Sequence, residues 1–461
     1  MTPALPAAAV RRRFLVLTLL RWLPTGFLLP LTAVFMQQRG LSLAEIGLVS
    51  ATSSVVVLGL ELPTGGLADA LGHRRVLLAA CAIDLVSVGL FLTAHALPAF
   101  LAAWVLQGVF RALDSGPLEA WFVTTSLRAA PHASVERGLA AAGVAVGAGI
   151  SLGALTGAAL ATWAPGGAAT ALALPVVAAI ALRAADLGAV AIWVHELTPE
   201  RAGVSTAVAD VPSVIRSGVA LLRRSRALTA LVVVELLWGA GMVAVELFTG
   251  PRLEELLGRA SEAVGILGVL TAVGWSVVAA GSAATPWLVA RLGSPARAGA
   301  ALRLAQGGAV AVAAVAGGPV GLVTAYLGFS LVHGAANAVH YGMVHRLVGD
   351  EERVTVLSLN SLSARIGSAA AALGFGVLAS RSGLPVVYGL AAALLALGAP
   401  LYRRAGSVRA GQSQAVAGDV VEDHLPAHRR GAQEAGEAPH VGQAVLRREP
   451  VAAVDLDGLV Q

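Results

Sequence analysis

The chain has 461 residues, of which 57% are hydrophobic and only 13% are charged, whereas soluble domains carry about 25% charged residues. Its formal net charge of +5 could suggest nucleic acid, but the arginines lie in short loops between apolar runs and form no basic, aromatic-rich face. These features exclude a soluble domain and a nucleic-acid-binding protein, so we expect most of the chain to be surrounded by lipid.

Apolar runs recur from Phe14 to Tyr402, and most are close to the roughly 20 residues that a helix needs to cross a bilayer. The first run continues through Arg21 and Pro24 without a small-residue cleavage site, so we expect a retained membrane helix and no removed signal peptide. Arg, Pro and Gly residues separate these apolar runs, and their positions predict twelve membrane helices in all. They are expected near 14–36, 43–63, 75–95, 98–122, 138–162, 168–194, 227–250, 262–290, 298–316, 320–345, 354–380 and 384–402.

The arginines predict the orientation, because positively charged loops stay in the cytoplasm. With the N-terminus inside, the cytoplasmic ends and loops hold 16 arginines and the outer loops hold four. The sequence therefore predicts an all-α membrane protein, with twelve transmembrane helices in two six-helix bundles and both termini cytoplasmic. We expect bundles at 1–194 and 227–402, a central cytoplasmic loop at 195–226, and a disordered cytoplasmic tail at 403–461.

A short loop between the second and third expected helices carries a recognisable pattern of glycine, acidic and basic residues. The pattern consists of Gly65, Leu67, Asp69, Gly72 and Arg74. It resembles the signature loop of the major facilitator superfamily, and residues 40–47, 61–65 and 111–121 are similar to actinobacterial members of that family. The resemblance covers roughly residues 14–402 and implies a transporter fold. It also implies that this loop gates the protein by latching one conformation of the two bundles.

Two other family patterns are incomplete in this chain. Trp104 stands where the family usually has an arginine, so a proton-relay role cannot be carried over to that position. Residues 149–158 resemble the antiporter motif, with Ala154 in place of its proline. Gly149, Gly153 and Gly157 repeat every four residues, which favours close helix packing or a sliding contact between helices.

Ionisable side chains inside the expected helices are the places to seek function. Each costs at least about 2.5–3.5 kcal/mol to insert and usually faces a cavity or a partner. Glu235 and Glu246 lie eleven residues apart on the seventh helix, which places them about 20° from alignment, and both are expected to face a central cavity. The candidate substrate- or proton-binding residues are Arg21, Arg111, Asp114, Glu119, Glu235, Glu246, His333 and Asn337.

Structural ion pairs are the competing interpretation for several of these charges. Arg111 with Asp114, and Arg183 with Asp186, are three residues apart on one helix and could pair. For the two glutamates a coupling role stays open, because a carboxyl group in apolar surroundings can carry a proton. We expect no metal site, because no carboxylate or thiolate accompanies the histidines of the tenth helix and the single cysteine stands alone.

No enzyme motif is present: the chain has no phosphate loop with lysine, no HExxH zinc pair and no GxSxG nucleophile turn. We therefore expect no catalytic residues and no cofactor. The sequence predicts a multi-pass secondary transporter of the cell membrane that moves a small organic solute by alternating access, without an obligate protein partner. The antiporter-like motif favours export of drugs or metabolites by proton exchange. A nutrient-uptake permease and a non-transporting ligand-binding scaffold or receptor stay open.

Overall fold

The computed structural model describes residues 6–64, 71–130, 132–163, 168–195, 216 and 218–405, and every regular element in this part of the chain is an α-helix. Eleven helices are long and apolar enough to cross a membrane, and the bent pair α1 (Ala7–Leu28) and α2 (Thr32–Gln38) makes a twelfth span. Pro30 lies at the 42° bend between these two helices. The helix is interrupted there because proline has no backbone N–H to donate. The predicted all-helical membrane fold is confirmed, and the described residues contain eleven spans, or twelve when the bent pair is counted as one.

The first half of the chain continues with six further helices. They are α3 (Leu43–Thr64), α5 (His73–Thr93), α6 (Leu97–Asp114), α7 (Pro117–Ala129), α8 (Val135–Trp163) and α9 (Ala168–Trp193). Helix α1 packs against α8 and α9, and α5 packs against α6 and α9. Gly116 separates α6 from α7 with a φ of +97°, a conformation that favours glycine. The fourth predicted span is thus two helices in sequence.

From Arg226 onward, the described residues of the second half form seven helices. They are α11 (Arg226–Leu257), α12 (Ala260–Ala283), α13 (Thr285–Leu292), α14 (Pro295–Val315), α15 (Pro319–Leu347), α16 (Asp350–Ser382) and α17 (Leu384–Leu397). Helix α11 packs against α16 and α17, and α14 packs against α15 and α17. The eighth predicted span is divided into α12 and α13 where Pro286 begins a new helix.

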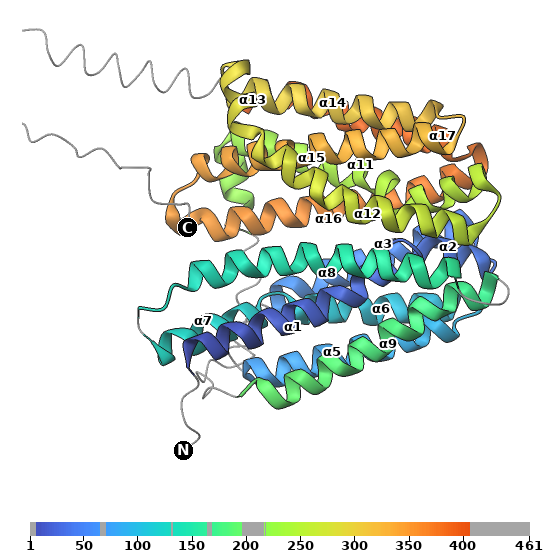
Figure 1. The fold of residues 1–461 in the computed structure, drawn as a ribbon. Coiled ribbons are helices and arrows are strands. Elements are labelled where there is room, and N and C mark those ends of the chain that lie inside the picture. Colours follow the sequence, from blue (N-terminus) through green and yellow to red (C-terminus); the bar gives the residue numbers. More distant parts are fainter. Residues whose placement is uncertain are drawn as a thin grey trace, which may run out of the picture. The chain divides into compact units, whose positions relative to one another are not determined.

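The two halves lie side by side in Figure 1, and the main helix pairs that join them are α3 with α16, α8 with α12, and α2 with α11. We call the end at which α1 and α11 begin the proximal end, and the end at which α2 and α11 end the distal end. The loop residues Gly65, Leu67 and Asp69, most of the expected central loop and residues 406–461 lie outside the described residues.

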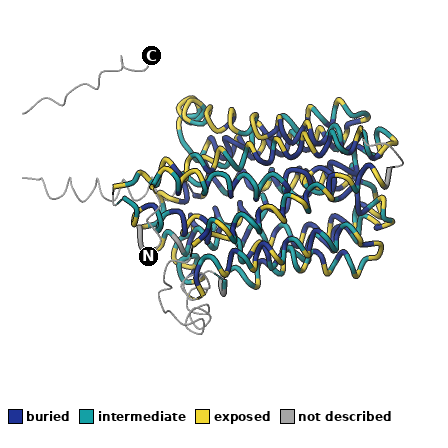
Figure 2. The backbone as a smooth tube through the Cα atoms, turned by 60° about the horizontal axis from the view of Figure 1, so that its bottom comes forward, coloured by how far each residue is buried: buried dark blue, intermediate teal, exposed yellow. Residues whose placement is uncertain are grey.

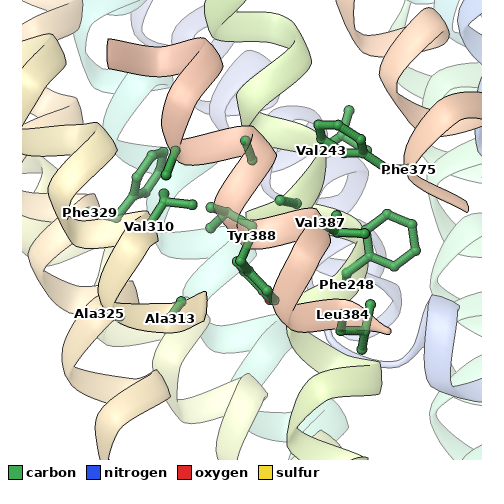
Figure 3. Close-up of a cluster of buried hydrophobic side chains, with 14 of the residues drawn as sticks. Val243, Phe248, Val310, Ala313, Ala325, Phe329, Phe375, Leu384, Val387 and Tyr388 are labelled. Carbon is green, nitrogen blue, oxygen red and sulfur yellow. The ribbon is translucent and has the colours of Figure 1, made fainter. Parts of the chain in front are cut away.

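Apolar side chains fill each half and also cover its outer surface. Figure 3 shows one core in the second half, where Phe248, Phe329 and Tyr388 pack together with smaller residues. Outward-facing residues such as Trp163 and Val315 are apolar as well, with exposed fractions of 84% and 83%. Figure 2 shows the exposed positions along the outside of the helices. An apolar exterior is what a lipid environment requires.

Candidate functional site

A cavity of about 380 Å³ lies between the two halves. The first half contributes residues of α1, α2, α3, α5, α6 and α9, and the second half contributes residues of α11, α12 and α16. Its uncharged polar lining residues are Thr25, Thr32, Ser50, Ser53, Ser54, Ser87, Gln107 and Ser368. Its large apolar lining residues include Met36, Phe91, Trp104 and Leu247. An apolar wall with a few polar groups at this size is typical of a small-molecule site.

Four charged side chains line this cavity: Arg111, Arg183, Glu246 and Arg365. Two of them are paired. Arg183 lies 2.7 Å from a carboxylate oxygen of Asp84, and Arg365 lies 3.0 Å from a carboxylate oxygen of Glu61 on the opposite half.

The other two cavity charges are Arg111, from the first half, and Glu246, from the second. Among the described residues, neither side chain makes a hydrogen bond or an ion pair, and the two attract each other across the cavity. Two opposite charges that contact no other charged group among the described residues therefore face one cavity from opposite sides of the interface.

The halves are joined at the distal end of this cavity. Gln38 donates a 2.5 Å hydrogen bond to Glu254, and the backbone N–H of Ala44 donates a 3.0 Å bond to the Ser380 hydroxyl. Backbones also touch there, because a β-carbon added to Gly47 would overlap the carbonyl oxygen of Ala372. The contacts between the halves at this end are thus both polar and closely packed.

A buried ion network, here called the first-half cluster, holds the first half together. It consists of Arg21, Asp84, Asp114, Arg183 and Asp186, from helices α1, α5, α6 and α9. Arg21 pairs with both Asp114 and Asp186, and Arg183 donates to the carbonyl oxygen of Arg21 at 2.8 Å. Neither expected within-helix pair, Arg111 with Asp114 or Arg183 with Asp186, is present among the described ion pairs. Asp114 and Asp186 both pair with Arg21 of α1 instead, and Arg183 pairs with Asp84 of α5.

A second buried network, here called the second-half cluster, occupies the other half. It consists of Glu235, Arg303, His340, Asn360 and Tyr402, from α11, α14, α15, α16 and the residues following α17. His340 is central: its Nε2 lies 3.3 Å from Glu235 and 3.1 Å from Asn360, and its Nδ1 lies 2.9 Å from the Tyr402 hydroxyl. Arg303 approaches Glu235 only to 4.0 Å. None of these five residues lines the cavity between the halves.

Of the eight candidate binding residues, Arg111 and Glu246 line the cavity. Arg21 and Asp114 belong to the first-half cluster, and Glu235 belongs to the second-half cluster. The expectation that both glutamates of α11 face one cavity therefore fits Glu246 and does not fit Glu235.

The remaining candidates lie apart from the cavity. Glu119 is exposed on α7, and Asn337 is half-buried on α15. The His333 ring stacks on Trp238 and Phe329, with ring-centroid distances of 5.5 and 5.9 Å. These three residues are not brought together with Arg111 and Glu246.

The described part of the signature loop and the glycine stripe both contact neighbouring helices. Gly72 has a φ of +93° directly before α5, and Arg74 donates a 2.9 Å hydrogen bond to the carbonyl oxygen of Ala191. Gly149, Gly153 and Gly157 all face α1, where a β-carbon would press on Trp22, on Leu23 or on Phe27. The stripe permits close approach of α1 and α8 within one half.

Sequence reasoning missed the polar face of α3. Ser50, Ser54, Val57 and Glu61 recur every three or four residues. Ser50, Ser54 and Val57 line the cavity together with the neighbouring Ser53, and Glu61 pairs with Arg365. A polar stripe of helical period on an otherwise apolar helix is the signal that could have revealed it.

Comparison with known proteins agrees with this arrangement. The sequence profile of the Major Facilitator Superfamily matches residues 14–338. No curated protein matches the chain. Among solved structures, the nucleoside transporter NupG has a TM-score of 0.70 at 13% identity, covering 86% of this chain and 98% of that one.

Two further solved structures have the same fold. A bacterial homolog of the human lysosomal transporter Spinster, in an inward-facing and unoccupied conformation, has a TM-score of 0.69 at 15% identity, covering 88% of this chain and 97% of that one. The human organic anion transporter MFSD10 (TETRAN) has a TM-score of 0.58 at 19% identity, covering 86% of this chain and all of that one. With its profile match, its helical architecture and its cavity between two halves, the chain belongs to the Major Facilitator Superfamily and is a membrane-spanning secondary transporter, not an enzyme.

Proposed function

We propose that this transporter exports an amphipathic organic solute in exchange for protons, using the cavity between the halves as its binding site. The observation that carries the proposal is that Arg111 and Glu246, which make no ion pair with any other described residue, face this cavity from opposite halves. A site built by both halves binds its ligand most completely when the halves close around it. Binding is thereby linked to the relative position of the halves.

Alternating access is supported by where the buried charges have their partners. The first-half and second-half clusters each compensate their charges within one half, so movement of one half against the other leaves those pairs intact. The contacts that must open at the distal end include polar ones, such as the bond between Gln38 and Glu254, and the close packing of Gly47 against Ala372. In this proposal the proximal end faces the cytoplasm, in agreement with the arginine distribution along the sequence.

Glu246 is the residue we assign to proton exchange. A carboxyl group that faces a cavity without a partner can bind either a proton or a cationic group of the substrate, but not both together. Such competition at one carboxylate links export of the solute to entry of a proton. Glu235 is a weaker candidate, because it is 1% exposed and lies beside His340 and Arg303 in the second-half cluster.

The function can be tested in cells that express the protein and are exposed to a broad panel of toxic amphipathic compounds. We expect resistance and lower intracellular accumulation of at least one compound class with the wild type. Both effects should disappear with Asp69→Asn in the signature loop and with Glu246→Gln in the cavity. The exposed residue Glu262, which pairs with Arg259 outside the cavity, provides the control Glu262→Gln, which should behave as wild type.

Two further outcomes separate the parts of this proposal. Purified protein in proteoliposomes should move the selected compound faster under a proton gradient, and Glu246→Gln should abolish that dependence. Flux by the wild type that does not depend on the proton gradient would contradict proton exchange. An absence of flux for every compound under every ion gradient would contradict transport itself.

A further inference from the structure

The charges of the cavity wall differ in how they are compensated. Arg183 and Arg365 each contact a carboxylate, Asp84 and Glu61 respectively, at 2.7 and 3.0 Å. Both arginines are therefore already neutralised by the protein. Arg111 and Glu246 have no such partner among the described residues, although both lie within spans where an isolated charge is costly.

The positions of these two charges define what a ligand must offer. Arg111 stands on α6 of the first half, and Glu246 stands on α11 of the second half. A ligand with only an anionic group would satisfy Arg111 and leave Glu246 facing the cavity. A ligand with only a cationic group would leave Arg111 uncompensated. One molecule that carries both charges satisfies both residues and spans the interface.

We propose that the substrate is a zwitterionic amphipath, in which a carboxylate binds Arg111 and an ammonium group binds Glu246; this inference rests on the transport function proposed above. The guanidinium group of arginine binds carboxylates through two parallel hydrogen bonds, which suits the first contact. The apolar body of the ligand packs against Phe91, Trp104 and Leu247, which line the same cavity. The serines of α3 and the Gln107 amide supply uncharged hydrogen-bonding groups around it.

A ligand with both charges would link binding to the relative position of the two halves. Because its two charged groups contact different halves, the complete set of contacts forms only when the halves are correctly placed around it. The ammonium group competes with a proton for Glu246, as the proposed exchange requires. A ligand that lacks either charge makes only part of these contacts and binds more weakly.

The test measures binding by the purified full-length protein in detergent, so that it does not depend on flux. The probes are aromatic amino acids whose ammonium and carboxylate groups are separated by linkers of increasing length. Each zwitterion is paired with its N-acetyl derivative, which is an anion, and with its methyl ester, which is a cation. We expect at least one zwitterion to bind about tenfold or more tightly than both of its derivatives, as measured by calorimetry and by thermal stabilisation.

Three variants assign the preference to the two residues. Glu246→Gln should remove the advantage of the zwitterion over its N-acetyl derivative, and Arg111→Gln should remove its advantage over the methyl ester. The double exchange of Arg111→Glu with Glu246→Arg should restore the preference for the zwitterion, which then binds in the opposite direction. Glu254→Gln, at the distal end and outside the cavity lining, is the control that should keep the wild-type preference.

Folding of each variant is checked by its unfolding temperature without ligand, and the double exchange remains informative if a single variant is unstable. Equal binding of zwitterions and their derivatives, no binding of any probe, or a preference that survives Glu246→Gln would overturn the inference. Resistance to the toxic panel that persists in the same protein would show that transport stands while this substrate class fails. Tight binding of zwitterions without flux would show the reverse.

Discussion

The first-half and second-half clusters bury polar groups in comparable places but compensate them differently. Each joins the first, third, fourth and sixth spans of its own half, and the second-half cluster also includes Asn360 of the fifth span. The first-half cluster contains two arginines and three aspartates in direct ion pairs. The second-half cluster contains one arginine and one glutamate 4.0 Å apart, surrounded by a histidine, an asparagine and a tyrosine.

This difference shows two ways to keep polar groups stable in lipid. The first half relies on close pairs of opposite charge, so loss of one partner leaves an isolated charge in a medium that solvates it poorly. The second half relies on neutral hydrogen bonds around a single distant pair, so loss of one group leaves others to compensate. In both halves the compensation stays inside the half, as movement of two rigid bodies requires.

Asp84→Asn should have the largest effect on stability, because it leaves Arg183 without its 2.7 Å partner. Removal of one partner of a buried pair costs about 3–5 kcal/mol. Thermal unfolding of the purified protein in detergent measures the loss. Glu262→Gln breaks an exposed pair with Arg259 and should cost under about 1 kcal/mol. Equal unfolding temperatures for the two variants would contradict the ion-pair account of the first half.

Glu235→Gln should cost less than Asp84→Asn, at about 1.5–3 kcal/mol. The reason is that Arg303 lies 4.0 Å from Glu235 and keeps a 2.6 Å hydrogen bond to Gln306 when the charge is removed. The same unfolding measurement gives the comparison directly. A loss as large as that of Asp84→Asn would show that both clusters depend equally on ion pairs.

Glycine contacts test whether the two halves are packed alike. A β-carbon at Gly153 would overlap the carbonyl oxygen of Leu23 on α1, and one at Gly367 would overlap that of Leu236 on α11. Overpacking of this kind costs about 1–3 kcal/mol, so Gly153→Ala and Gly367→Ala should be similarly destabilised. Gly143→Ala, on α8 with open space around it, is the matched control. An unfolding temperature that falls equally in the control would reject the packing argument.

Tyr402→Phe should have the smallest effect, at about 0.5–1.5 kcal/mol, because it removes a hydroxyl that bonds to His340 and also lies beside Arg303, and leaves the charged groups of the cluster in place. Tyr388→Phe removes a comparable bond to Thr249 from the apolar core of the same half. The two variants should therefore unfold at similar temperatures. A much larger loss for Tyr402→Phe would mean that the second-half cluster acts as one cooperative network.

The helices could be predicted from the sequence because each span must satisfy its backbone internally and present apolar side chains to lipid. The breaks at Gly116 and Pro286 were not predicted, because each lies inside a segment that was expected to form one span. Spacing along a helix could show that Arg111 and Glu246 lie on polar faces. It could not show which helix supplies each partner, and Asp114 pairs with Arg21 of another helix.

The two glutamates of α11 show that helical spacing alone does not predict the surroundings of a side chain. Glu235 and Glu246 point in nearly the same direction, but eleven residues separate them by about 16 Å along the helix. At the level of Glu246 the helix borders the cavity, and at the level of Glu235 it contacts Arg303 of α14 and His340 of α15. The neighbouring helix changes along the axis, and only the tertiary packing contains that information.

The most direct test of alternating access measures from which side the cavity can be reached. Ser53→Cys places a thiol on the cavity wall, while the native Cys81 is buried and serves as the unlabelled background. Membrane-impermeant thiol reagents are applied to right-side-out and to inside-out vesicles. Gln38→Cys with Glu254→Cys, cross-linked before labelling, fixes the distal contact in its closed form.

Under alternating access, Ser53→Cys should be labelled from both sides before cross-linking and only from the proximal side afterwards. Reduction of the cross-link should restore labelling from the distal side. Labelling from both sides in the cross-linked protein, or labelling from one side alone in the free protein, would contradict alternating access around this cavity.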